Sequence, residues 1–398
     1  MQVTPDFHIT YCTNVHPGAD WETTFKALEQ HLDQIRSAVS GNRPFGLGLR
    51  LSDKASKELN SGNRLAEFRK WLEQHNTYVF TMNGFPYGNF HAEPVKDQVH
   101  HPDWTTKDRL EYTLRLFRQL AFLLPTGIEG GISTSPVSYR HWHKTDGDKH
   151  QVLKAGANHM IAVALELMRI ERESGQYMHL DIEPEPDGLL ENSTDVLQFF
   201  ESYLVPLGIE QINRMYDLPA LEAKALLLRH ITVCYDVCHF ALAFENPETV
   251  FTNCHRAGIQ IGKIQVSAAL RIPSFGPDQT SIIEALKAFD EPVYLHQVTT
   301  LTPSGVKTWS DLAELLMETR SYSELRAHFH VPIFEGQYGI LGATQREILE
   351  VVAYLKKHPI SKHLEVETYT WDVLPGPKEA LAESVSRELN WLITQIVS

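Results

Sequence analysis

Short runs of β-forming residues alternate with longer amphipathic segments along the chain. In one such segment, Leu110, Leu114, Phe117, Ala121 and Leu124 recur at the three- and four-residue spacing that places apolar side chains on one helix face. The β-like runs cover residues 8–14, 45–52, 78–83, 127–133, 177–183, 231–236, 261–267 and 363–370. The predicted helices cover residues 21–39, 65–75, 107–124, 156–173, 194–204, 218–229, 247–257 and 344–357.

Eight strands alternating with helices predict an α/β fold of the (β/α)8 TIM-barrel type. The alternative is a doubly wound open sheet, which usually begins with a Gly-rich phosphate loop, and none follows the first predicted strand. No Pro/Gly-rich linker divides the chain, so we expect residues 1–398 to form a single domain. A long insertion, residues 268–342, separates the seventh and eighth strands and holds two further β-like runs, 293–299 and 328–334. We expect it to cover the barrel mouth.

Four consecutive predicted strands each carry a polar face, because alternate residues of a strand share a face. The polar residues are His179, Asp181 and Glu183 on the fifth strand, Thr232, Cys234 and Asp236 on the sixth, Lys263, Gln265 and Ser267 on the seventh, and Glu365, Glu367 and Tyr369 on the eighth. In a barrel these faces point to the centre, where ionised carboxylates need a cationic partner. Glu183, Asp236 and Glu367 therefore form a candidate metal site at the carboxyl ends of the strands. The alternative is a partly open sheet with solvated polar faces.

Histidines near these strand ends are further candidate ligands. His239 follows Asp236 at a spacing that lets both side chains reach one metal, although Asp236 could equally cap the next helix and His239 could be an ordinary loop histidine. His328 and His330 share one face of a predicted strand in the insertion, and His296 is a further candidate. The remaining histidine pairs, His100 with His101 and His141 with His143, fall in predicted loops, where we expect surface or mouth positions.

Composition narrows the class of protein. The 398 residues are 42% hydrophobic and 22% charged, which suits a globular protein with a full core. A formal charge of −14 without a dense Lys/Arg run argues against nucleic acid as a partner. No signal peptide or membrane-spanning stretch is visible, and the 4 cysteines lack zinc-finger spacing. We therefore expect a reduced cytoplasmic protein with no direct membrane insertion.

The pattern of strand-end residues resembles the xylose isomerase-like TIM barrels, the superfamily of sugar isomerases, epimerases and endonuclease IV. The resemblance implies that Glu183, Asp236 and Glu367 are metal ligands, and that His239 completes a D-x-x-H motif. Gln265 stands where the superfamily usually has a histidine ligand on the seventh strand. His328 and His330 resemble an acid–histidine pair that holds a further metal in endonuclease IV. The endonuclease histidines of the third and fourth strands are missing from residues 83–86 and 133–136, which argues against DNA repair.

A closer resemblance is to the EboE-type "metabolite traffic" TIM-barrel proteins. It is carried by residues 10–14, 83–88, 131–136, 294–297 and 330–334. Gene clusters of that family are associated with processing or export of secondary metabolites, often beside a prenyltransferase-like membrane protein. The resemblance therefore implies a small-molecule substrate and possible pathway partner proteins.

Together these features predict a metal-dependent enzyme that acts on a small polyhydroxylated or phosphorylated metabolite, as a monomer or homodimer. One divalent ion, zinc or manganese, is expected between Glu183, Asp236, Gln265 and Glu367, and a second between His239, His328 and His330, with His296 as a further candidate. Glu183 and Glu367 are the predicted catalytic base and acid, and Lys263 and His179 are predicted to orient substrate or ligands. One metal favours an isomerase or epimerase, and two favour a hydrolase. The alternative is a metabolite carrier without catalysis, and endonuclease activity is the third possibility.

Overall fold

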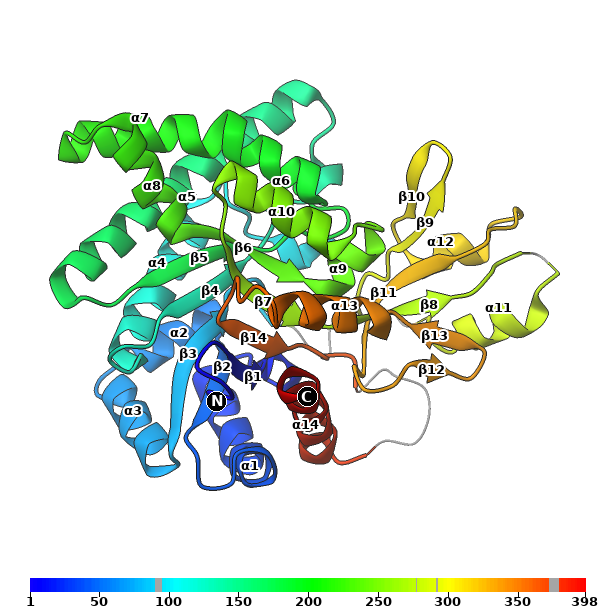
Figure 1. The fold of residues 1–398 in the computed structure, drawn as a ribbon, viewed down its shortest axis with the longest axis horizontal. Coiled ribbons are helices and arrows are strands. Elements are labelled where there is room, and N and C mark those ends of the chain that lie inside the picture. The colour runs from blue at the N-terminus through cyan, green and yellow to red at the C-terminus, as the bar shows by residue number, and fades with distance from the viewer. Residues whose placement is uncertain (90–94, 277, 291–292, 372–378) are drawn as a thin grey trace.

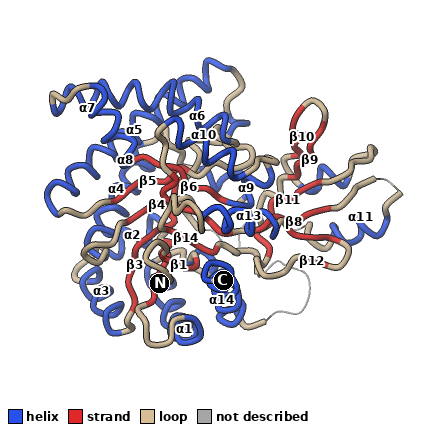
Figure 2. Tube along the Cα trace, in the orientation of Figure 1, coloured by secondary structure: helices blue, strands red, loops and turns tan. Residues whose placement is uncertain are grey.

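The computed structural model describes residues 1–89, 95–276, 278–290, 293–371 and 379–398. Within them, parallel strands form a barrel enclosed by helices, which confirms the predicted fold class (Figures 1 and 2). The barrel strands are β1 (His8–Tyr11), β2 (Phe45–Arg50), β3 (Thr77–Asn83), β4 (Gly130–Thr134), β5 (Met178–Ile182), β6 (Ile231–Asp236), β7 (Ile261–Val266) and β14 (His363–Val366). Their spatial order is β1-β14-β7-β6-β5-β4-β3-β2.

Side chains of β1 nearly close the barrel between β1 and β2. A single parallel bridge joins Cys12 to Gly48. The hydroxyl oxygen Oγ1 of Thr10 accepts a hydrogen bond from the backbone N–H of Gly48 at 2.8 Å, and Oγ1 of Thr13 accepts one from the N–H of Arg50 at 2.8 Å. Hydroxyl groups therefore satisfy backbone donors of β2 where the ladder between the two strands is incomplete.

Helices pack around the strands with their apolar faces inward, and several begin at a residue whose side chain caps the first turn, such as Asp20 and Thr106. The helices of the barrel are α1 (Trp21–Val39), α2 (Asp53–Leu59), α3 (Arg64–Gln74), α4 (Lys107–Leu123), α5 (Asp146–Ser174), α6 (Ser193–Phe199), α7 (Val205–Tyr216), α8 (Ala220–His230), α9 (Val237–Leu242), α10 (Pro247–Ala257), α13 (Gln345–Leu355) and α14 (Leu381–Val397). No helix in the described part of the chain is long and apolar enough to cross a membrane.

The insertion between β7 and β14 forms an antiparallel sheet beside the barrel (Figure 1). Its strands are β8 (Ala268–Ile272), β9 (Val298–Thr302), β10 (Gly305–Trp309), β11 (Leu325–Val331), β12 (Gln337–Tyr338) and β13 (Leu341–Ala343), and it carries the helices α11 (Thr280–Lys287) and α12 (Leu312–Leu316). The order is β10-β9-β11-β8-β13-β12. The pairing of β11 with β8 shifts register between Ala327 and Val331, so the ladder is interrupted at the two candidate histidines. A bulge of this kind re-aims side chains.

Some predicted boundaries were wrong. The run 293–299 is mostly irregular, and its strand begins only at Val298, because the preceding residues turn their side chains into a pocket instead of a sheet. The helix predicted at 156–173 begins ten residues earlier, at Asp146, where Thr145 forms a capping box with Asp148. The last helix, α14, was not predicted. It packs against α1 and β1 through apolar residues at helical spacing that include Val385, Leu389 and Leu392.

Candidate metal centre

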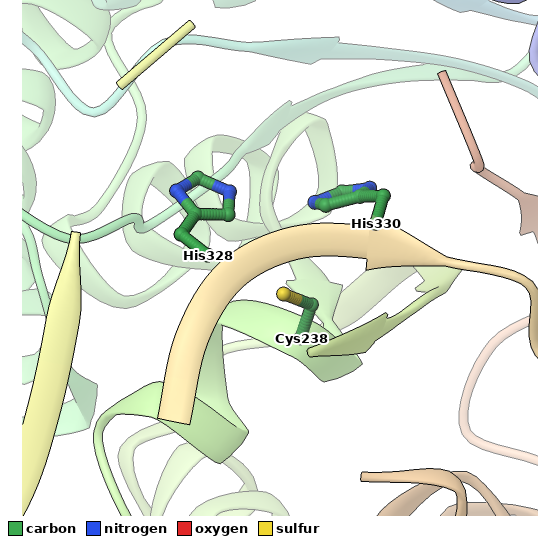
Figure 3. Close-up of side chains that lie close together, drawn as sticks. All are labelled: Cys238, His328 and His330. Atoms are coloured by element: carbon green, nitrogen blue, oxygen red, sulfur yellow. The ribbon is translucent and has the colours of Figure 1, made fainter. Parts of the chain in front are cut away.

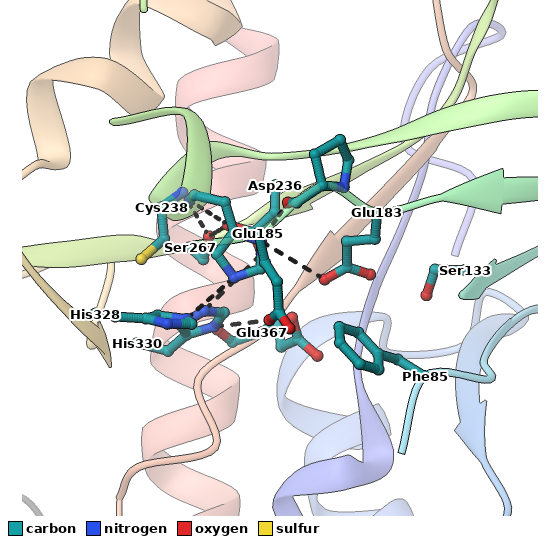
Figure 4. Close-up of polar contacts among 12 residues, drawn as sticks. Phe85, Ser133, Glu183, Glu185, Asp236, Cys238, Ser267, His328, His330 and Glu367 are labelled. Atoms are coloured by element: carbon teal, nitrogen blue, oxygen red, sulfur yellow. Dashed lines mark hydrogen bonds and ion pairs between the residues drawn. The ribbon is translucent and has the colours of Figure 1, made fainter. Parts of the chain in front are cut away.

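Three acids converge at the carboxyl ends of the barrel strands (Figure 4). Glu183 follows β5, Asp236 is the last residue of β6, and Glu367 follows β14. One carboxylate oxygen from each lies within 4.8 Å of the others, and the three side chains are buried. Because parallel strands present their ends at one edge, residues distant in the sequence meet here.

Hydrogen bonds from the protein reach only some of the carboxylate oxygens in this acidic cluster. Oε1 of Glu367 accepts hydrogen bonds from the side-chain amides of Asn14 at 2.7 Å and Asn83 at 2.9 Å. Oδ1 of Asp236 accepts them from the Ser267 hydroxyl at 2.7 Å and from the backbone N–H of His239 at 3.0 Å. Oε2 of Glu183 and Oδ2 of Asp236 are buried and have no hydrogen-bond partner. Two buried carboxylate oxygens therefore lack the group that would compensate them.

The electrostatics point the same way. Burial, followed by the nearby carboxylates Glu367 and Asp236, raises the pKa of Glu183 well above its usual value. Burial, Asp236 and Glu365 raise the pKa of Glu367 to about 8. The buried ammonium of Lys263 is paired with Glu365 at 2.7 Å, one side-chain layer below the strand ends. A divalent cation would remove this repulsion, so the donor set fits a metal.

Gln265 of β7 is the fourth residue predicted for this site. It lies beside Asp236 and Glu365 in the strand register and is fully buried. Neither its amide oxygen nor its amide nitrogen has a hydrogen-bond partner. A buried amide with both polar atoms unsatisfied is rare, and its oxygen suits a hard divalent cation.

A second cluster comprises His239, His328 and His330. In each ring, Nδ1 faces an oxygen acceptor: the Pro184 carbonyl at 2.9 Å, the Gln297 side-chain oxygen at 2.8 Å and the Glu367 carbonyl at 2.9 Å, respectively. Acceptors of this kind place the ring hydrogen on Nδ1 and leave the lone pair on Nε2, with the amide orientation of Gln297 assigned from the same network. All three rings thus present Nε2 as a possible metal ligand.

The geometry of this histidine cluster also fits a metal. Nε2 of His239 and Nε2 of His328 lie 3.1 Å apart, close to the spacing of about 3.3 Å between two ligands of one tetrahedral zinc ion. Nε2 of His330 is buried without a hydrogen-bond partner. Burial and the other histidines lower the pKa of His328 well below its usual value, and burial lowers that of His330 to about 4, so both rings are held in the neutral, ligating form.

The bulge in β11 explains how two histidines of the insertion reach the barrel. Figure 3 shows the arched segment with His328 and His330 projecting from the same side, above the thiol of Cys238. Cys238 has its sulfur within 4.8 Å of ligand atoms of both rings, and burial raises the pKa of its thiol well above the usual value. Asp236 lies within the same distance of ligand atoms of His239 and His330, so the acidic and histidine clusters adjoin.

A pocket opens onto both clusters. Its walls include Glu183, Glu367, His239, His328, His330, Asn14, Asn83, Phe85, Glu185, His100, Tyr294, Gln297 and Tyr369. His100 and Glu185 form a buried pair on this wall, with Nε2 and Oε1 2.9 Å apart. His100 was expected at the surface or the mouth and lies buried on the mouth wall, whereas Glu185, Asn14, Asn83 and Gln297 were not predicted as site residues. Asn83 ends strand β3, where the strand pattern alone did not mark it, and the others lie in irregular or 3-10 segments without periodic pattern. A short Glu183-Pro184-Glu185 repeat of acids was the only signal for Glu185.

Three predicted site residues lie away from this pocket. Lys263 is fully buried at mid-height in the barrel with Glu365. His179 lies at the opposite end of β5 from Glu183, with its Nδ1 2.6 Å from Oδ1 of Asp181. His296 packs on Phe329 and faces the backbone carbonyl of His328 through Nδ1 at 2.9 Å, so it contacts the strand that carries the histidines.

Comparison with known proteins identifies solved structures of similar fold. No protein-family model matches the chain, and no curated protein sequence matches it. Similar structures include an IolI protein with a zinc atom (12% identity, 98% of this chain and 97% of that chain, TM-score 0.48). A D-tagatose 3-epimerase-like protein is 10% identical over 98% of this chain and 99% of that chain, with a TM-score of 0.48. A xylose isomerase-like TIM barrel protein from Mycobacterium smegmatis, in complex with magnesium, is 10% identical over 97% of this chain and 98% of that chain, with a TM-score of 0.47. These similarities concern the chain trace and leave activity open.

Proposed function

We propose that the protein is a metal-dependent TIM-barrel enzyme that isomerises or epimerises a small polyhydroxylated or phosphorylated metabolite. The observation that carries this proposal is the convergence of Glu183, Asp236 and Glu367, which leaves two buried carboxylate oxygens uncompensated beside a pocket. With Gln265, these residues would hold one divalent ion, zinc or manganese. Such an ion would polarise a carbonyl or hydroxyl oxygen of the substrate.

The chain's own groups supply proton transfer. Burial and the neighbouring acids raise the pKa of Glu183, so a bound cation would be needed to keep this carboxylate ionised. Its second oxygen could then take a proton from the carbon next to a substrate carbonyl. Glu367 is held rigidly by Asn14 and Asn83 through Oε1, and its raised pKa suits a group that returns a proton at neutral pH. The two carboxylates would thus serve as base and acid beside the reacting carbon. Phe85, Tyr294 and Tyr369 line the same pocket and limit the access of water.

A second ion would be held by His239, His328 and His330, and zinc is the metal that three imidazoles favour. The adjoining of the two clusters through Asp236 favours hydrolysis of a phosphate ester as the second candidate reaction. The two reactions differ in their products, because isomerisation exchanges a carbon-bound hydrogen and hydrolysis releases phosphate.

A non-catalytic metabolite carrier is the remaining alternative, and Gln265 is the residue that favours it. An amide is a weaker ligand than the histidine usual at this position of the superfamily. The segments that resemble the EboE-type proteins support a place in the processing or export of a secondary metabolite, for either an enzyme or a carrier. A carrier would bind its ligand in the same pocket and leave it unchanged.

Solvent exchange tests the reaction directly. Metal-loaded protein is incubated in D2O with a panel of aldoses, ketoses and their phosphate esters, and deuterium at the carbon next to the carbonyl is followed by NMR. The proposal predicts exchange that Glu183→Gln and Glu367→Gln reduce by at least about 100-fold. Glu185→Gln is the matched control, because this acid lines the same pocket but pairs with His100.

The same panel separates the alternatives. Phosphate release without deuterium exchange would replace the isomerase with the hydrolase. Binding of a panel member without any chemical change, retained in Glu183→Gln, would establish the carrier. A metal-free protein with no response to any divalent ion would overturn the proposed function.

A further inference from the structure

A further group of potential metal ligands, apart from the acidic and histidine clusters, lies at the opposite end of the barrel. Glu129 directly precedes β4, His179 is the second residue of β5, and His363 is the first residue of β14. One ligand atom from each lies within 4.8 Å of the others. Because these positions are at the amino ends of their strands, the group lies on the barrel floor, roughly 13 Å of strand below Glu183.

Both histidines have the hydrogen-bond partners typical of metal ligands. Nδ1 of His179 faces Oδ1 of Asp181 at 2.6 Å, and Nε2 of His363 faces the backbone carbonyl of Glu129 at 3.2 Å. Each oxygen accepts the ring hydrogen, so the lone pairs remain on Nε2 of His179 and Nδ1 of His363. A ligating histidine almost always donates its other N–H to a carboxylate or a carbonyl in this way.

The cluster contains two buried acceptors with no donor. Nδ1 of His363 and Oδ2 of Asp181 have no hydrogen-bond partner, and both side chains are fully buried. Leaving a buried acceptor unsatisfied costs about 1–3 kcal/mol, and a lone pair and a carboxylate oxygen cannot satisfy each other. A cation at Nδ1 of His363 would satisfy this lone pair and would also stabilise the adjoining carboxylate of Asp181.

Two glycines leave space for such a group. A Cβ on Gly131 of β4 would lie 2.5 Å from Cε1 of His179, 2.7 Å from Oδ2 of Asp181 and 2.9 Å from Nδ1 of His363. The three groups therefore converge on the place where most residues would put a side chain. Gly262 of β7 leaves similar room beside Asp181. A bulkier residue on either strand would fill the floor of the barrel.

The third ligand, Glu129, lies at the edge of the cluster. Glu129 is half-buried, and its Oε2 is 2.9 Å from Nζ of the exposed Lys362, so it sits at the boundary with solvent. Two imidazoles with one carboxylate form a ligand set that zinc uses widely.

We propose that Glu129, His179 and His363 bind a zinc ion at the floor of the barrel, separate from the mouth clusters, with Asp181 orienting His179. Because the ion ties together the starts of β4, β5 and β14, its role is to stabilise the barrel where its interior is polar. The site takes no part in the reaction proposed for the mouth.

The test removes the mouth sites first. The variant Asp236→Asn/His330→Gln is stripped with chelator, reloaded with zinc and desalted, and its metal is measured by elemental mass spectrometry. The proposal predicts about one equivalent of zinc retained. Adding His363→Gln or, independently, Glu129→Gln lowers the zinc affinity at least about tenfold. His358→Ala, an exposed histidine, is the matched control and leaves the zinc content unchanged.

Two results would overturn the floor site. One is a mouth variant that remains folded by circular dichroism and retains no zinc. The other is retained zinc that neither His363→Gln nor Glu129→Gln weakens. Glu129 lies at the edge of the cluster, so its variant stays informative if loss of His363 prevents folding. If the mouth clusters bind no metal, the result differs. The wild type would then still bind zinc, and only substitutions of the floor residues would remove it.

Discussion

Nε2 of His239 and Nε2 of His328 face each other at 3.1 Å, and Nδ1 of each ring faces an oxygen acceptor. Two nitrogens hold this distance when a cation, either a shared proton or a metal ion, lies between them. His239 comes from the barrel helix α9 and His328 from the insertion strand β11. A metal at this point would therefore join the insertion to the barrel.

We expect loss of either ring to weaken binding of a metal ion at the histidine cluster. His239→Ala and His328→Ala should each weaken binding of one metal by at least about tenfold, because three ligands become two. Cobalt(II) substitution gives a visible absorption band that reports nitrogen ligation, so titration with cobalt measures the effect. His255→Ala, an exposed histidine on α10, should titrate as the wild type does. Unchanged cobalt spectra in both ring variants would contradict the assignment.

Gln265→His should strengthen metal binding at the acidic cluster of Glu183, Asp236 and Glu367. The amide of Gln265 makes no hydrogen bond that the substitution would remove, and imidazole is the stronger ligand for zinc. The expected change is at least about tenfold tighter binding in competition with a chromophoric chelator. Equal or weaker binding would mean that the β7 position does not face the metal.

The buried pair of Lys263 and Glu365 should matter for stability. Lys263→Met leaves the carboxylate of Glu365 buried and uncompensated, which typically costs about 3–5 kcal/mol of the free energy of unfolding. Lys263→Met/Glu365→Gln should recover most of this loss, because no charge then remains. Urea unfolding of the three proteins measures both effects. A single variant as stable as the wild type would show that the pair contributes little.

Stability should also depend on pH through Glu388 of α14. This carboxyl is buried, accepts hydrogen bonds from Thr368 and the Ile333 backbone, and has its pKa raised by burial from 4.5 to about 8. The folded protein therefore binds this proton more tightly than the unfolded chain. The protonated carboxyl of Glu388 therefore adds at most about 5 kcal/mol to the free energy of unfolding. This stabilisation is complete below about pH 4.5 and is lost as the pH rises through 8.

The variant Glu388→Gln isolates that contribution, since the amide resembles the protonated acid. We expect urea midpoints of the variant to fall less than those of the wild type between pH 6 and pH 9. Glu383→Gln, an exposed acid on the same helix, should retain the wild-type slope. Parallel slopes in all three proteins would assign the pH dependence to other groups.

The sequence was sufficient to predict the barrel and the meeting of Glu183, Asp236 and Glu367, because both follow from simple periods along the chain. Alternation of strands and helices predicted the fold, and the two-residue period placed Glu183, Asp236, Gln265 and Glu367 on inward faces. The strand ends then meet because the strands are parallel. Such arguments need no knowledge of distant contacts.

The parts that could not be predicted depend on contacts between distant or irregular segments. The amide of Asn14 that holds Glu367 is 353 residues away in the chain, and the resemblance of residues 10–14 gave this side chain no role. The approach of His328 and His330 depends on a bulge, which a strand pattern does not reveal. His179 and Glu183 share a face, but their separation along β5 places them at opposite ends of the barrel.

Metal content tests the central claim most directly. Wild type, Asp236→Asn and Glu185→Gln are purified in parallel without added metal and measured by elemental mass spectrometry. Asp236 lies in both mouth clusters, whereas Glu185 lines the same pocket and pairs with His100. We predict bound zinc or manganese in the wild type and in Glu185→Gln, with at least about one equivalent lost in Asp236→Asn. Equal metal content in all three proteins, or no metal that the wild type takes up on addition, would contradict the metal centre.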